Sequence, residues 1–118
     1  MFLTDNGYNF DDYTSTRYWS NKTRIEYIQR RIILFSIMYY QLNDSIVSDN
    51  QYNNISKQLV NLMSQTDKSI VKKTKYYYVF KDFDCSTGFD LYYKLNPVDK
   101  DYLYTMATQI LFGHRKRS

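Results

Sequence analysis

The chain has 118 residues, a length at which one domain can bury a core without metals or disulfides. Its single cysteine, Cys85, excludes an intramolecular disulfide and cannot by itself form a tetrahedral metal site. The formal charge of +4 permits weak contact with nucleic acid and argues against a DNA-mimicking inhibitor, which would be acidic.

The first 20 residues show no hydrophobic period, so we expect an irregular N-terminal arm, followed by one small domain over residues 21–118. Four aromatic residues can pack this arm down: Phe2, Phe10, Tyr18 and Trp19. The acidic start lacks the order of a signal peptide, and no apolar run approaches the ~18 residues of a membrane span. We therefore expect a cytoplasmic protein without membrane contact.

From Asn21 to Leu42 the apolar residues recur at spacings of three and four, which predicts an α-helix. They are Ile25, Ile28, Ile32, Phe35, Tyr39 and Leu42. The wet face of its first half carries Arg24, Glu26, Arg30 and Arg31. The second half, "IILFSIMYY", is apolar all round, so we expect it to be enclosed on more than one side.

A second helix is predicted from about Asp49 to Ser64, with an inner stripe of apolar residues. The stripe consists of Tyr52, Ile55, Leu59, Leu62 and Met63. Ser48 and Gln51 have the spacing of a capping box, and Asp49 in the first turn favours the helix dipole. Because the elbow is short, the two helices form an antiparallel hairpin over residues 21–64.

Residues 76–93 are predicted to form a turn and strand region. The aromatic and β-branched run "YYYVF" favours a strand, with a return strand through Phe89 and Leu91. A last helix spans residues 97–112, capped by Asn96 and ended by Gly113. The predicted fold is therefore mainly α, in an α+β arrangement of a helical hairpin, a C-terminal helix and a short β-hairpin.

Catalytic groups are sparse. His114 is the only histidine and lies beyond the predicted last helix, so a nucleophile–histidine pair would depend on the tail. Asp82 and Asp84 flank a turn without a fuller cation ligand set, and "STG" at 86–88 lacks the lysine of a phosphate loop. We expect a protein that is no enzyme, has no metal site and requires no cofactor.

Basic residues offer a weak nucleic-acid surface. They are Arg30, Arg31, Lys72, Lys73, Lys75 and the tail residues Arg115, Lys116 and Arg117. Such a surface contacts phosphates without reading sequence, so the affinity would fall steeply with salt.

The fourteen tyrosines suit a binding surface, although AT-rich codon usage is an equal explanation. Folding the hairpin brings Tyr39 and Tyr40 to the same end as Asp49 and Tyr52. A ring beside a carboxylate and the amide of Asn53 can hold a planar heterocycle with a ribose. The alternative is that the tyrosines are core residues and Asp49 serves only the helix start.

Residues 28–63, "IQRRIILFSIMYYQLNDSIVSDNQYNNISKQLVNLM", resemble the small N-terminal Ia domain of bacterial NAD-dependent DNA ligases. In that family a helix ends in Tyr-Tyr or Tyr-His, and an elbow leads to Ser-Asp-x-x-Tyr-Asp and a Leu-rich helix. The matching residues are Tyr39, Tyr40, Leu42, Ile46 or Val47, Ser48, Asp49, Tyr52 and Leu59. The resemblance implies that Tyr39 and Tyr40 face the nicotinamide and ribose of nicotinamide mononucleotide, and that Asp49 binds its polar groups.

Two features depart from the ligase family. Asn53 stands where the family has a second aspartate. The resemblance covers about 36 of 118 residues, and the chain has no Lys-x-Asp-Gly for an adenylated lysine, so we expect that it cannot seal nicks alone. The hairpin, "FKDFDCSTGF" and the last helix together are similar to small ligase-like proteins of phages of Gram-positive bacteria, which implies a phage or prophage origin and the host cytoplasm.

The leading hypothesis is a non-catalytic phage-type binding protein whose ligand is NAD or nicotinamide mononucleotide. Its site residues are Tyr39, Tyr40, Asp49, Tyr52 and Asn53. One alternative is a phage protein that inhibits or redirects a host or defence enzyme through its Tyr-rich surface. A second alternative is the weak nucleic-acid-binding protein described above.

Overall fold

The computed structural model of the chain describes residues 3–4, 7–8, 19–83, 85 and 88–117, of which 3–4, 7–8 and 115–117 are described by their backbone alone. The elements are β1 Leu3–Thr4, β2 Gly7–Tyr8, α1 Asn21–Ser36, η2 Ile37–Gln41, α2 Asp49–Gln65, α3 Lys68–Val71, α4 Tyr77–Phe80, α5 Leu91–Lys94 and α6 Pro97–Arg117. The fold is mainly helical, as predicted.

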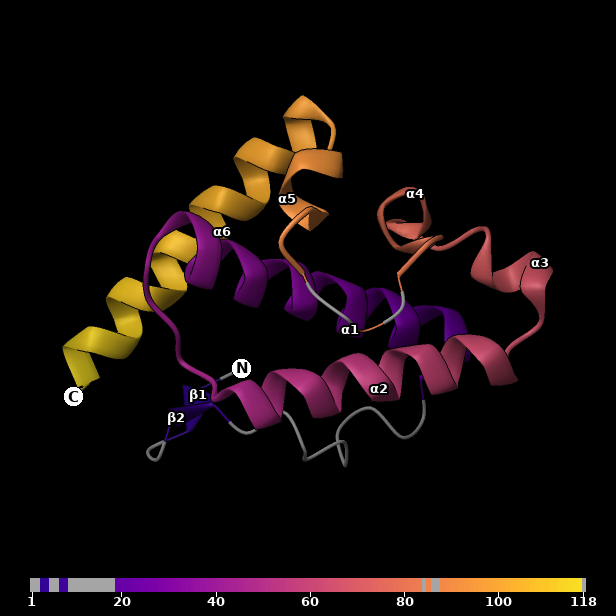
Figure 1. Cartoon of the computed structure of the whole chain (residues 1–118), viewed down its shortest axis with the longest axis horizontal. Helices are drawn as coiled ribbons and strands as arrows, with labels where there is room; N and C mark the ends of the chain where they lie inside the picture. The colour runs from indigo at the N-terminus through magenta and orange to yellow at the C-terminus, as the bar shows by residue number, and fades with distance from the viewer. Residues whose placement is uncertain (1–2, 5–6, 9–18, 84, 86–87, 118) are drawn as a thin grey trace.

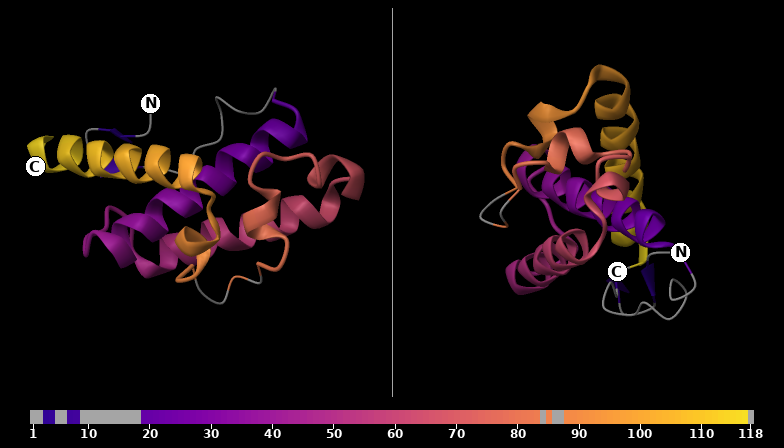
Figure 2. Two further views of the ribbon diagram at one scale, coloured as in Figure 1. Left: turned by 90° about the horizontal axis from the view of Figure 1, so that it is seen from above. Right: turned by 90° about the vertical axis from the view of Figure 1, so that its right-hand side faces the viewer.

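Helix α1 lies at the centre of the molecule. Ser20 caps it by accepting a hydrogen bond from the backbone N–H of Thr23 at 3.2 Å. Helix α2 packs along one side of α1, and α5 and α6 pack on the other (Figures 1 and 2). Residues 31–38 are all buried as a result. This confirms that the apolar second half of the first helix is enclosed on more than one side.

Helices α1 and α2 run antiparallel and form the predicted hairpin (Figure 1). The capping box is present: Ser48 Oγ accepts from the Gln51 N–H at 3.1 Å, and Gln51 Oε1 accepts from the Ser48 N–H at 2.9 Å. Ile55 and Leu59 of α2 are fully buried, with the rest of the predicted stripe packed around them. The start of α2 is therefore fixed by local sequence as well as by packing.

The end of the first helix differs from the prediction in kind. The α-helix ends at Ser36, and the chain continues as one turn of π-helix, η2. In this wider turn the Leu42 N–H donates to the Ile37 carbonyl at 3.1 Å, and the Asp44 N–H to the Met38 carbonyl at 2.9 Å. Single π turns occur mostly within α-helices and frequently at functional sites. Here the π turn carries Tyr39 and Tyr40.

The predicted β-hairpin within residues 76–93 is wrong, because this region contains the single-turn helices α4 and α5. Tyr76, Val79 and Phe80 are buried, as are Leu91 and Leu95. These spacings of three and four put each set on one face of a helical turn. The β-propensity of "YYYVF" is therefore overridden by burial in the core, since strand propensity depends strongly on context.

Helix α6 begins as predicted and ends later. Asn96 Oδ1 accepts a hydrogen bond from the Asp99 N–H at 2.8 Å, and Pro97 is the first helical residue. The predicted end at Gly113 is wrong, because α6 continues to Arg117. A glycine ends a helix by adopting a left-handed conformation, and Gly113 is helical with open space around it.

Of the N-terminal arm, the structure describes a two-stranded antiparallel pairing of β1 with β2 and residues 19–20. Phe2, Phe10 and Tyr18 lie outside the described residues. The Trp19 ring packs edge-on against Tyr27, with their centroids 5.1 Å apart. In the described part of the chain, no helix combines the length and the apolar character that a membrane crossing needs.

Candidate functional site

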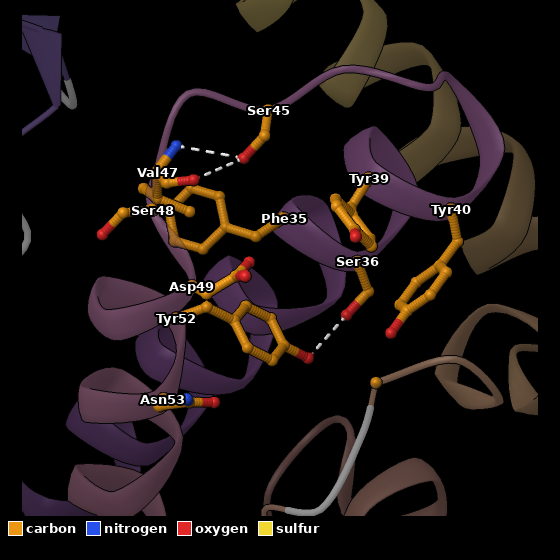
Figure 3. Close-up of a pocket in the computed structure, with 11 residues that line it drawn as sticks. Phe35, Ser36, Tyr39, Tyr40, Ser45, Val47, Ser48, Asp49, Tyr52 and Asn53 are labelled. Atoms are coloured by element: carbon orange, nitrogen blue, oxygen red, sulfur yellow. Dashed lines mark hydrogen bonds between the residues drawn. The ribbon is translucent and has the colours of Figure 1, made fainter.

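The elbow end of the α1–α2 hairpin, where the chain connects the two helices, contains a pocket of about 290 Å³ (Figure 3). It is built by the end of α1, η2, the elbow and the first turns of α2, with Gly88 on the remaining side. All five residues expected from the sequence line it: Tyr39, Tyr40, Asp49, Tyr52 and Asn53. Segments that are separate in sequence therefore bring these side chains around one space.

Tyr39 and Tyr40 are surface residues, not core residues. Their side chains are 53% and 37% exposed. The two rings meet edge to face, with centroids 4.8 Å apart and planes at 88°. Tyr40 makes a second edge-to-face contact with Phe89, at 5.4 Å. Such pairs hold rings in a defined orientation, so the tyrosine pair presents fixed aromatic surface to the pocket.

Asp49 lies in the first turn of α2, where its charge favours the helix dipole. Figure 3 shows its carboxylate pointing into the pocket. Among the described residues, none forms a hydrogen bond or an ion pair with this carboxylate. Asn53 follows one helical turn later on the same face of α2. The pocket therefore offers a carboxylate and an amide side by side.

Tyr52 and Ser36 join the two helices at the base of the pocket. Ser36 Oγ donates to the Ile32 carbonyl at 2.8 Å, and the Tyr52 hydroxyl lies 2.9 Å from the same Oγ. Because the single Ser36 proton goes to the carbonyl, the Tyr52 hydroxyl is the donor in the second bond. Burial raises the pKa of Tyr52 to about 12, so this hydroxyl keeps its proton at neutral pH.

Phe35 and Ser36 line the pocket and were not predicted as site residues. Ser36 is the one polar residue within the apolar run "IILFSIMYY". A lone hydroxyl in such a run needs a partner when buried, and this was the available signal for its role. No comparable signal existed for Phe35, whose spacing is that of an ordinary core residue.

Gly88 closes the pocket through its lack of a side chain. A Cβ at this position would lie 1.9 Å from Tyr52 Oη and 2.4 Å from Ser36 Oγ. The backbone at Gly88 therefore approaches both hydroxyls directly, which only glycine permits without displacement. The sequence pattern "STG" predicted a turn, and residues 86–87 of it lie outside the described residues.

Models of known protein families, curated proteins and solved structures provide no match to this chain. The likeness of residues 28–63 to the ligase Ia domain accordingly stays a prediction.

A row of exposed rings extends from the pocket across α5. Phe89 and Tyr93 are 55% and 59% exposed, and their centroids lie 6.0 Å apart. Gln41 of η2 donates to the Tyr93 hydroxyl at 3.4 Å, which ties this row to the hairpin. We call Tyr39, Tyr40, Phe89 and Tyr93 the ring row. It was missed from the sequence because Phe89 was assigned to a strand.

The predicted basic surface is only partly present. Arg31 is buried, with 4% exposure, and its guanidinium lies over the Tyr27 ring at 4.1 Å and donates to the Tyr27 hydroxyl. Its assignment to the wet face is therefore wrong, because its long stem and planar head pack well against a ring. Arg30 is half-buried, and Lys72, Lys73 and Lys75 are exposed.

The other chemical candidates do not converge on the pocket. His114 lies within α6, not beyond it, and Asp82 is exposed. Asp84 and the side chains of Arg115, Lys116 and Arg117 lie outside the described residues. Within the described part of the chain, no group of three His, Cys, Asp or Glu residues is placed to hold a metal ion.

Proposed function

We propose that the chain is a non-catalytic binding protein whose pocket holds the nicotinamide and ribose of a nicotinamide nucleotide. The observation that carries this proposal is the convergence of Tyr39, Tyr40, Asp49, Tyr52 and Asn53 on one pocket. Four of these positions, Tyr39, Tyr40, Asp49 and Tyr52, match the nucleotide-binding part of the ligase Ia domain, and Asn53 stands where that family has a second aspartate. The absence of Lys-x-Asp-Gly from the sequence supports a binding role rather than nick sealing.

The size of the pocket supports a small ligand. Its volume of about 290 Å³ lies at the lower end of the ~300–1,000 Å³ typical of ligand sites. A nicotinamide ring with part of its ribose matches this volume better than a whole dinucleotide does. We therefore expect NAD to bind through its nicotinamide half, with its adenosine half outside the pocket.

Each polar group has a role in this proposal. The faces of Tyr39 and Tyr40 stack against the nicotinamide ring and flank its ribose. The Asp49 carboxylate accepts hydrogen bonds from ribose hydroxyls or from the carboxamide N–H₂. Asn53 can donate as well as accept, so it can bond to whichever of these groups Asp49 leaves unpaired.

Calorimetric titration with nicotinamide mononucleotide and with NAD tests the proposal. We expect binding of both ligands with similar affinity, and a loss of at least about tenfold in the variants Tyr39→Ala and Asp49→Ala. Tyr102→Ala is the matched control, because Tyr102 is a similarly exposed tyrosine on α6 outside the pocket. Absence of heat at millimolar ligand, or heat that neither pocket variant changes, would refute the proposal.

A second candidate function rests on the ring row. Four exposed aromatic side chains in successive contact form the kind of surface that dominates protein–protein hot spots. Under this alternative the chain binds a host or defence enzyme and inhibits or redirects it. Capture from a bacterial lysate that is lost in Phe89→Ala and Tyr93→Ala, and that added nucleotide does not compete, would favour it over the first proposal.

Nucleic-acid binding has less support. With Arg31 buried and Arg30 half-buried, the predicted phosphate contacts that the structure shows exposed are Lys72, Lys73 and Lys75. This alternative requires an affinity for single- or double-stranded DNA that falls steeply with salt. The phage-type origin and the host cytoplasm as location stay predictions from the sequence.

A further inference from the structure

The charges around the pocket differ from those of the chain as a whole. The chain carries 16 Lys and Arg residues and a formal charge of +4. No Lys, Arg or His is found among the described residues that line the pocket, where Asp49 supplies the only carboxylate. The adjoining groove on the other side of Tyr39 and Tyr40 repeats the pattern, with Asp44 as its charged residue among those described.

Aromatic side chains are the second feature of the pocket that favours a cation. Phe35, Tyr39, Tyr40 and Tyr52 all line the pocket. The face of an aromatic ring carries partial negative charge and attracts a cation within about 6 Å. Tyr39 and Tyr40 stand edge to face at 88°, so their ring faces point in perpendicular directions, and a ligand can lie against the face of one ring while it touches the other. A carboxylate among aromatic side chains is a combination that recognises organic cations.

We propose that the pocket selects a flat organic cation of the pyridinium class, and that it recognises the charged ring and ribose without a contribution from the phosphate. This inference rests on the proposed function, since it names the ligand class of the same pocket. The N-substituted nicotinamide ring of an oxidised nicotinamide nucleotide is such a cation, whereas free nicotinamide is neutral. A phosphate entering the pocket would meet Asp49 without a compensating cation among the described lining residues.

A matched set of four small molecules isolates the charge of the ring. Nicotinamide and 1-methylnicotinamide differ by one methyl group and one positive charge. Nicotinamide riboside adds the sugar, and nicotinamide mononucleotide adds the phosphate. We expect 1-methylnicotinamide to bind about tenfold more tightly than nicotinamide, and the riboside at least as tightly as the mononucleotide. Titrations followed by protein NMR give all four dissociation constants, including those in the millimolar range.

Two variants assign the preference to the carboxylate. Asp49→Asn keeps the shape of the side chain and removes its charge, so the ratio of the nicotinamide to the 1-methylnicotinamide dissociation constant should fall about threefold or more. The affinity for neutral nicotinamide should change by less than the affinity for the cation, because the Asn side-chain oxygen can still accept a hydrogen bond from the carboxamide. Asp101→Asn is the control, because Asp101 is an exposed aspartate of α6 that does not line the pocket.

The outcomes separate this inference from the function on which it rests. If none of the four molecules binds, the nucleotide pocket and its charge preference both fail. If the molecules bind but nicotinamide equals 1-methylnicotinamide, or the mononucleotide binds about tenfold more tightly than the riboside, the pocket stands and the cation preference is wrong. A preference that survives Asp49→Asn unchanged would also overturn the role given to the carboxylate.

Discussion

The two ends of the α1–α2 hairpin contain similar side chains with different surroundings. At the far end, where α1 begins and α2 ends, Trp19 packs against Tyr27 and Asn21 donates to Thr66, and further along α1 the Arg31 guanidinium covers the Tyr27 ring. At the elbow end, Tyr39 and Tyr40 are exposed. The Asp49 carboxylate there forms no hydrogen bond or ion pair with a described residue. Residue type alone therefore does not distinguish a structural cluster from a candidate binding site, whereas a pocket lined by a carboxylate without a described partner does.

The largest expected effect contrasts two tyrosines of the same continuous helical segment. Tyr27→Ala removes a ring that packs against Trp19 at 5.1 Å and beneath the Arg31 guanidinium at 4.1 Å. We expect the free energy of unfolding to fall by about 2–3 kcal/mol, because a half-buried aromatic side chain and its contacts are lost. Tyr39→Ala should change it by less than about 0.5 kcal/mol. Urea denaturation of both variants measures this, and equal losses would contradict the comparison.

The next largest effect is expected from a substitution of Gly88, which lines the pocket at the elbow end. In Gly88→Ala the new Cβ collides with Tyr52 Oη and Ser36 Oγ, so the backbone must move away from the hairpin. We expect a loss of about 1–3 kcal/mol in unfolding free energy and weaker binding of nicotinamide mononucleotide.

The matched control for this variant is Gly113→Ala. Nothing lies within 4 Å of a Cβ at Gly113, which is an interior residue of α6. Replacing a helical glycine by alanine should stabilise the protein by about 0.5–1 kcal/mol. Thermal denaturation distinguishes the two, and a Gly88→Ala protein as stable as the parent would show that the loop is free to retreat.

A smaller effect depends on pH and isolates the Tyr52–Ser36 hydrogen bond. Burial raises the pKa of Tyr52 from 10.0 to about 12, so the unfolded chain releases this proton first and stability is lost as the pH rises through this range. Tyr52→Phe should be about 1 kcal/mol less stable than the parent near pH 8, because the bond to Ser36 is lost. Near pH 11 the parent has lost about the same amount through ionisation, so the difference should vanish. Urea denaturation at both pH values checks this, and a difference that stays constant would mean that folding does not raise the pKa of Tyr52.

The sequence was most informative where local rules act. The capping box at Ser48, the cap at Asn96 and the apolar period of the hairpin depend on residues within a few positions of each other, and all three are present. The grouping of Tyr39, Tyr40, Asp49 and Tyr52 around one pocket was predictable because they flank a short elbow, which brings them to one end of the hairpin.

The features that the sequence missed depend on contacts over longer distances. The "YYYVF" segment forms a helical turn because Tyr76, Val79 and Phe80 are buried together, which overrides its strand propensity. Gly88 closes the pocket from about 50 residues away from Ser36, and its pattern signalled only a turn. Arg31 has the composition of a surface residue, and only the position of Tyr27 and its neighbours reveals that it is covered.

The smallest expected effect comes from adding a negative charge to the elbow end. Asn53 stands on the same face of α2 as Asp49, one turn later, and it occupies the position of the second aspartate in the ligase-like pattern. Asn53→Asp should cost about 0.2–0.5 kcal/mol of stability, since like charges four residues apart repel on a helix.

If the elbow end selects cations, the repulsion between Asp49 and the new carboxylate should favour binding of a cationic ligand. A bound pyridinium relieves the repulsion between the two carboxylates, so 1-methylnicotinamide should bind about threefold more tightly to Asn53→Asp, while the affinity for neutral nicotinamide should change by less. Asn61→Asp is the control, because Asn61 is exposed on α2 and does not line the pocket. NMR titration of the three proteins measures these affinities. A gain for the neutral ring equal to that for the cation would mean that Asn53 acts through its hydrogen bonds rather than through its lack of charge.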